Sequence, residues 1–242
     1  MPDTVLVVDR GVAAVRVLRA LQSRGIKAVS VHTGADATAL HATLADETVL
    51  LGPTTASYGD IVKLVEAARQ AGAHAVHPVT VELAELGPAV LAAGLEWLGG
   101  SLQVPVELSV GDGVVEARCS DRLTTLPPAA SRSAEVVTGL DLTGASLTGE
   151  SEGVARAGVA VSVDVVASTL APITTLHLPA GEDIWVDAAV ASGTHPAEPL
   201  LAVLTAWGPD RDTAYSRACE AWDELVIDGP VVHRPEALGG QQ

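Results

Sequence analysis

Short runs of β-branched and aliphatic residues alternate with helical segments over residues 4–100, and this alternation restricts the fold more than any other feature. The first run, Thr4–Val8, is typical of a strand buried on both faces, and Asp9, Arg10 and Gly11 then turn the chain into a helix. Strands connected by helices through short loops form a mostly parallel sheet covered on both faces, so we expect an open Rossmann-like α/β domain. The other predicted strands are Lys27–His32, Thr48–Leu51 and Ala73–His77, and Tyr58–Ala71 is predicted to be a helix.

The helix that follows Gly11 has two different sides. Spacings of three and four residues define an apolar side, expected to pack on the sheet, made of Ala14, Val17, Leu18 and Leu21. Another side carries Arg16, Arg19 and Ser23.

The composition excludes several classes of function. The formal net charge of −16 repels phosphate backbones, and a chain without Phe and with two Tyr offers little for base stacking, so we expect no nucleic-acid binding. The first residues do not form a cleavable apolar leader and no apolar run reaches about 18 residues, so we expect a cytoplasmic protein without a membrane segment. Cys119 and Cys219 lack the paired spacing of a metal or redox site and are interpreted as free thiols.

The residues do not support a nucleotide site on the predicted sheet. The first turn between strand and helix has one glycine, Gly11, instead of the G-x-G-x-x-G spacing that brings pyrophosphate close to the backbone. No P-loop lysine signature is present either.

The second half of the chain is predicted to be mostly β. Alternating apolar residues around Gly111 and Gly113 indicate a hairpin, and 126–131 is interpreted as a loop. Runs rich in Val and Ile predict a partly covered antiparallel sheet, followed by the helix Thr213–Leu225 and a last extended segment, Val226–Gly229. The predicted strands of this sheet are Val159–Val166, Ile173–Leu178, Ile184–Val190 and Leu200–Trp207.

No set of side chains predicts catalysis. His74 and His77 are three apart on a predicted strand, which directs their side chains to opposite faces. His195 and Glu198 lie in a predicted loop, where a histidine near a glutamate is far more often a solvated turn than an acid–base pair. We therefore expect no catalytic residue, no metal site and no cofactor.

Several short segments, in the right order, resemble biotin carboxylase, the ATP-using component of acyl-CoA carboxylases. Asp9-Arg10-Gly11 stands where that family has Asn-Arg-Gly-Glu, and Ser57-Tyr58 opens the next helix as it does there. Further matches are Ala35-Asp36, His41, 44–47, the strand pair 106–117, 137–142, the segment 177–181 and the terminal helix.

The resemblance implies a chain of three parts. These are a biotin carboxylase N-terminal-like (Rossmann-like, pre-ATP-grasp) domain at 1–100, a shortened remnant of the ATP-grasp region at 101–152, and a small antiparallel C-terminal-like α+β domain at 153–242. About fifty residues for the middle part is the lower limit of what folds as a domain. This part contains no lysine, whereas an ATP-grasp enzyme needs one for the phosphate charge.

The chain departs from the family pattern where chemistry would be expected. The family's glutamate after Arg-Gly is Val12, the arginine that serves biotin carboxylation aligns with Trp185, and the lysine of Asp-Ser-Met-Ile-Gly-Lys-Leu is Val203. The family's glycine-rich loop after His-Pro is 79–86 here and has lost those glycines.

The resemblance and these departures together predict a non-catalytic relative that acts by binding. The expected partners are subunits of a biotin-dependent acyl-CoA carboxylase, either the biotin carboxylase or the carboxyltransferase component, and a homodimer is a further expectation. Arg19 occupies the family's interface arginine position, so Arg16, Arg19 and Ser23 are the candidate partner interface. Three functions remain open: an inhibitor of the carboxylase, an assembly subunit, or a residual enzyme or ligand sensor that uses an open sheet edge around Asp9, His32 and His77.

Overall fold

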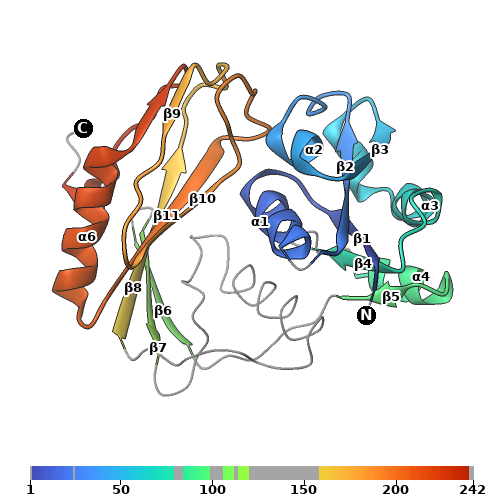
Figure 1. The fold of residues 1–242 in the computed structure, drawn as a ribbon, viewed down its shortest axis with the longest axis horizontal. Coiled ribbons are helices and arrows are strands. Elements are labelled where there is room, and N and C mark those ends of the chain that lie inside the picture. The colour runs from blue at the N-terminus through green and yellow to red at the C-terminus, as the bar shows by residue number, and fades with distance from the viewer. Residues whose placement is uncertain are drawn as a thin grey trace.

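The computed structural model describes residues 2–23, 25–78, 84–98, 106–111, 114–119 and 158–239. Two sheets with their helices lie side by side, and helix α1 (Gly11–Gln22) lies between them (Figure 1). The predicted fold class, a Rossmann-like α/β part followed by a small antiparallel α+β part, is confirmed.

The amino-terminal sheet is parallel throughout. Its strands follow the order β3-β2-β1-β4-β5, so that the chain crosses from one side of β1 to the other. Because each strand returns through a connection on a face of the sheet, all five run in one direction. The strands are β1 (Thr4–Val8), β2 (Lys27–Thr33), β3 (Glu47–Gly52), β4 (Ala75–Pro78) and β5 (Glu96–Trp97).

Helices cover both faces of this sheet. On one face α1 packs Leu18 and Leu21 against Val5 and Val7 of β1. This face also receives residues at the end of the short helix α2 (Leu40–Leu44). On the other face lie α3 (Ile61–Gln70) and α4 (Leu86–Ala92). The apolar side predicted for α1 is confirmed, since Ala14, Val17, Leu18 and Leu21 are all buried.

The helix predicted to start at Tyr58 starts later. Tyr58 lies in the 3₁₀ turn η1 (Thr55–Gly59), and Asp60 adopts an extended conformation before α3. The Asp60 carboxylate accepts a hydrogen bond from the Lys63 backbone N–H, which makes Asp60 the N-cap and fixes the start of α3. The separate turn leaves Tyr58 buried against β2.

The second sheet is antiparallel and is covered by helix α6 (Arg211–Glu224) on one face. Helix α6 packs Ala214, Ala218 and Ala221 on β8 and β11, and these small side chains allow close approach. The strand order is β10-β11-β8-β7-β6. The strands are β6 (Val106–Gly111), β7 (Val114–Cys119), β8 (Gly158–Val166), β10 (Ile184–Ala188) and β11 (Leu200–Gly208).

The segment predicted to be a further strand of this sheet belongs elsewhere. Strand β9 (Thr175–His177) pairs with β12 (Val226–Asp228) in a separate two-stranded sheet. The residues before β9 are hydrogen-bonded away from the main sheet, since Thr174 N–H donates to the Asp228 carbonyl and Ile173 N–H to the Thr194 carbonyl. A short 3₁₀ turn, η2 (Glu236–Leu238), follows near the end of the chain.

The middle of the chain contributes to the second sheet. The predicted hairpin is confirmed, with Gly111 paired to Val114, and β7 continues the sheet beside β8. The predicted loop 126–131 and the changed loop positions 79–83 lie outside the described residues. The boundaries at 100 and 152 therefore stay predictions, although strands from both sides of the second boundary share one sheet.

Candidate functional site

Helix α1 contacts both halves of the molecule. Its inner side packs on its own sheet, whereas Val12 packs with Ala189 and Val203 of the other half, supported by Leu200. Contacts of α1 with β10 and β11 continue along the helix. We call the contacts between residues 10–16 and 187–203 the α1 junction.

Arg16, predicted to lie on a partner surface, lies in the α1 junction. Its side chain is almost fully buried, and its Nε lies 3.4 Å from Asp187 Oδ2 at the sheet edge formed by β10. The sequence could not show that a second sheet covers this side of the helix. Arg16 therefore forms an ion pair within the chain, and its exposure to a partner was wrongly predicted.

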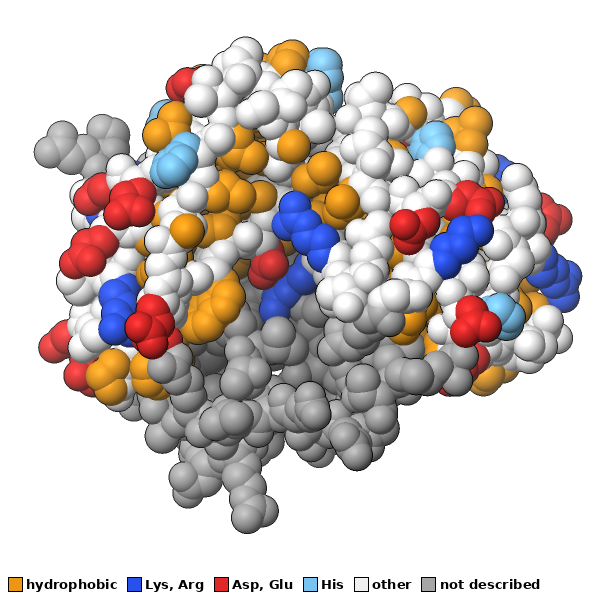
Figure 2. Space-filling view, in the orientation of Figure 1, with side chains coloured by type: hydrophobic (Ala, Val, Ile, Leu, Met, Phe, Trp, Pro, Cys, Tyr) orange, Lys and Arg blue, Asp and Glu red, His pale blue; other side chains and the backbone are white. Residues whose placement is uncertain are grey.

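Arg19 and Ser23 remain on the surface of α1. Both are exposed, and the Ser23 hydroxyl donates a hydrogen bond to the Ala20 carbonyl over 2.9 Å. Figure 2 shows Lys and Arg side chains beside an acidic side chain between the two halves. Of the three predicted interface residues, these two are placed where a partner could reach them.

Two positions that depart from the family pattern lie in the same apolar cluster. Val12 is 5% exposed and Val203 is 2% exposed, and they belong to the same apolar cluster although the resemblance places a glutamate and a lysine there. Burial of two valines is favourable, whereas one buried charge without its partner is costly. The two valines are thus compatible with one another in a buried cluster, as a single charged residue there would not be. Trp185, the third departure, lies half-buried on β10 opposite Thr205.

The sheet edge around Asp9, His32 and His77 was expected to be open to solvent. Two of these three residues are buried. Asp9 is 6% exposed and His77 is 1% exposed, while His32 is half-buried. The Asp9 carboxylate accepts a hydrogen bond from the Arg10 N–H, and Arg10 in turn donates to the Ala197 carbonyl of the other half. The α1 junction therefore begins directly after Asp9, which leaves no open edge at that residue.

A buried hydrogen-bonded network lies next to this edge. The Tyr58 hydroxyl donates to Asp36 Oδ2 over 2.9 Å and lies 3.1 Å from the Val31 carbonyl, and His41 Nε2 lies 3.2 Å from the same hydroxyl. Asp36 Oδ1 accepts from the Thr33 N–H and hydroxyl. Because a carboxylate only accepts, Tyr58 donates to Asp36 and its oxygen accepts the His41 Nε2–H.

Burial controls the protonation states in this network. It lowers the pKa of His41 to about 4, against the smaller raising effect of the Asp36 charge. Burial also raises the pKa of Tyr58 well above its usual range, and the Asp36 charge and hydrogen bond add to this. Both side chains are therefore uncharged at neutral pH and contribute through hydrogen bonds. The network holds the loop after β2 against η1.

The sequence contained part of the signal for this network. Asp36, His41 and Tyr58 each matched the family pattern, but nothing in their spacing showed that they meet. Glu198, predicted to be in a loop, lies beside Gly11 of the other half. Sequence spacing could not show a proximity between residues so far apart in the chain.

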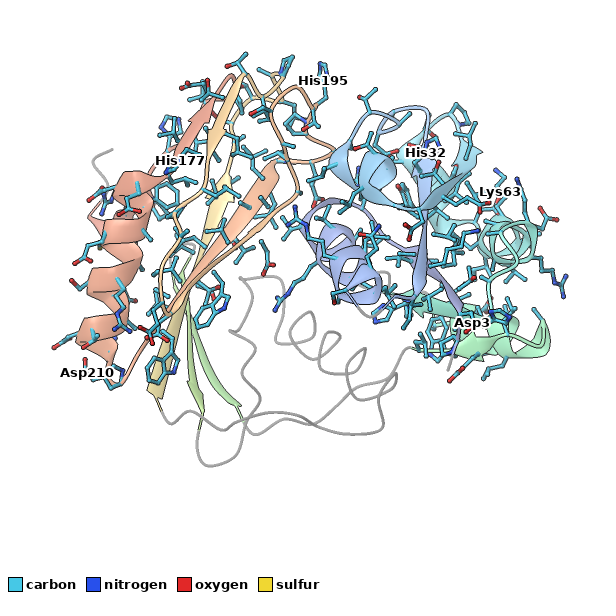
Figure 3. The ribbon with its side chains drawn as sticks, viewed as in Figure 1. Asp3, His32, Lys63, His177, His195 and Asp210 are labelled. Atoms are coloured by element: carbon cyan, nitrogen blue, oxygen red, sulfur yellow. The ribbon has the colours of Figure 1, made fainter. Side chains whose placement is uncertain are left out.

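The remaining histidines do not gather. His74 is exposed before β4, and Figure 3 shows His32, His177 and His195 at separate places, with His32 and His195 on different halves. Within the described ranges, no three His, Cys, Asp or Glu side chains are close enough to hold a metal ion. Cys219 is a free, half-buried thiol on α6. No helix among the described residues is long and apolar enough to cross a bilayer.

An open parallel α/β sheet joined to a small antiparallel sheet defines the class of fold, and known sequences show what its first part is similar to. Residues 1–104 match the family described as biotin carboxylase, N-terminal domain. A biotin-dependent acyl-coenzyme A carboxylase alpha3 subunit of Mycobacterium leprae is 44% identical over 104 residues, covering 41% of this chain and 17% of that protein. A biotin carboxylase of Pseudomonas aeruginosa is 38% identical over 109 residues, covering 43% and 24%.

Solved structures extend the likeness of fold to nearly the whole chain. The urea carboxylase of Kluyveromyces lactis has a TM-score of 0.73 at 19% identity, covering 96% of this chain and 30% of that one. The biotin carboxylase domain of a single-chain bacterial carboxylase has a TM-score of 0.71 at 19% identity, covering 98% and 94%. The protein is therefore biotin carboxylase-like and related to acyl-CoA carboxylase subunits, although it spans less than a quarter of the two curated relatives.

The buried network predicts a pH-dependent stability. Since the pKa of His41 is about 4 in the folded chain and about 6.5 in an unfolded one, only the unfolded state takes up this proton between these values. The free energy of unfolding should fall by about 2 kcal/mol as the pH drops from 6.5 to 4. Urea titrations at several pH values should show that His41→Gln loses this part of the dependence. His74→Gln, at an exposed position, should keep it; equal slopes in wild type and His41→Gln would contradict the assignment.

The placement of Arg16 predicts unequal effects of two neighbouring arginines. Arg16→Met should lower the free energy of unfolding by about 1–3 kcal/mol, because it removes a buried cation and leaves Asp187 without it. Arg19→Met, on the exposed side of the same helix, should change it by less than about 0.5 kcal/mol. Equal losses in thermal and urea unfolding would show that Arg16 is not buried in the junction.

Proposed function

We propose that this protein is a non-catalytic, biotin carboxylase-like pseudoenzyme that binds an acyl-CoA carboxylase complex and inhibits it. The observation that carries the proposal is the burial of Val12 and Val203 in one apolar cluster of the α1 junction, where the family resemblance places charged residues. Two halves held together by apolar residues at these positions suit a partner-binding protein better than an enzyme active site.

The lysines of the chain support a non-catalytic role. The sequence contains two, Lys27 and Lys63, and both lie on the amino-terminal half. Lys27 pairs with Glu47 over 2.6 Å and Lys63 with Asp60 over 3.3 Å, both at the surface. Phosphoryl transfer needs cationic groups directed at the phosphates, and neither lysine is placed among the altered positions of the junction.

We propose that Arg19 contacts the partner. It is exposed in the last turn of α1, on a chain whose net charge is −16. An exposed cation on an acidic protein favours an acidic partner surface and contributes more to partner choice than to total affinity. Ser23, one turn further, belongs to the same proposed surface.

Arg19→Glu should weaken binding to the carboxylase. Purified protein titrated into an acyl-CoA carboxylase assay is expected to lower the rate. Arg19→Glu should raise the protein concentration that gives half-maximal inhibition by about tenfold, because its charge repels an acidic partner. Arg69→Glu, an equal charge change on the exposed end of α3, is the matched control and should act like wild type. Equal effects of the two variants would contradict the assignment of the surface.

The same titration separates the alternative functions. Co-purification with an unchanged rate would favour an assembly subunit over an inhibitor. Cleavage of ATP by the isolated chain would contradict both and favour a residual enzyme.

A further inference from the structure

Helix α1 has no N-terminal cap of its own. Its N-cap residue is Arg10, which makes no capping side-chain hydrogen bond, and its first turn contains no acidic residue. Helices α3 and α6, in contrast, begin at Asp60 and Asp210, whose carboxylates accept from backbone N–H groups three residues later. The free N–H groups and positive dipole end of α1 therefore require a partner from elsewhere.

Glu198 of the other half lies at this helix end. A Cβ atom added to Gly11 would lie 2.0 Å from Glu198 Oε1 and 2.7 Å from its carboxyl carbon. Gly11, with φ of +66°, thus leaves room for the carboxylate in a backbone conformation that other residues avoid. A carboxylate at a helix N-terminus is favourable both as a hydrogen-bond acceptor and as a charge.

The contacts around Glu198 hold it against the helix. Arg10 Nη1 donates to the Ala197 carbonyl over 3.4 Å, directly beside Glu198. The apolar cluster of Val12 and Val203 lies one residue further along α1, and Arg16 and Asp187 follow one turn later. Polar, apolar and ionic contacts therefore succeed one another along a single side of the helix.

We propose that Glu198 is the N-terminal cap of α1, supplied by the carboxy-terminal half, and that the apolar cluster around Val12 and Val203 makes the two halves fold as one unit. The start of α1 is stable only while the second sheet is docked on it. The contact is a conformational device internal to the chain and is independent of any partner.

Hydrogen exchange of the full-length chain tests the cap. Glu198→Ala should speed exchange of the backbone amides in the first turn of α1 by roughly fivefold or more, the usual effect of losing a cap. Glu198→Gln, which keeps an acceptor but loses the charge, should give a smaller increase. Asp60→Ala is the matched control and should speed exchange at the start of α3 only. Unchanged exchange in α1 of Glu198→Ala, with the control responding, would overturn the proposal.

A double-mutant cycle tests the apolar part. Val12→Glu and Val203→Lys should each speed exchange in both halves, because each buries a charge without its partner. The double variant should recover protection to well above that of either single variant, since the two charges then face each other. Additive losses would show that the two positions do not contact. Neither test uses a carboxylase, so their outcome is separate from that of the proposed function.

Discussion

Burial of helix α1 on two sides is the constraint on which the rest of the structure depends. One side packs Leu18 and Leu21 on the parallel sheet, and the other packs Val12 and Arg16 on the antiparallel sheet. A surface helix normally buries one apolar stripe, so a second buried side must find partners for both apolar and charged residues. Val203 and Asp187 provide them and so join the two halves of the molecule.

The architecture could be predicted from the sequence because its signals are local. Thr4–Val8 and the apolar side of α1 follow from periodicity alone, and the structure confirms both. The predictions that were wrong depended on distant contacts. Arg16 has the spacing of a surface residue, but β10 covers it, and Ile173–Leu178 has strand composition, but its central part pairs with β12 instead of the main sheet. Periodicity describes a helix or strand and does not reveal which second sheet will cover it.

The candidate site was predictable only in part, for the same reason. The departures at Val12 and Val203 were visible in the sequence, but their contact was not. Asp9 and His77 do lie at the carboxyl ends of neighbouring strands, as a parallel sheet requires, yet burial removes them from a role at an open edge. Apolar residues occupy junction positions at which the family resemblance places charges, and Arg19 and Ser23 are exposed on the same helix.

Native-state hydrogen exchange at increasing urea concentrations tests the central claim most directly, because it reports the unfolding free energy of each strand separately. If α1 joins the halves into one unit, the slowest amides of β1 and of β11 should give the same unfolding free energy and the same dependence on urea. Loss of protection in β8, β10 and β11 at a urea concentration that leaves β1 and α1 fully protected would contradict the account.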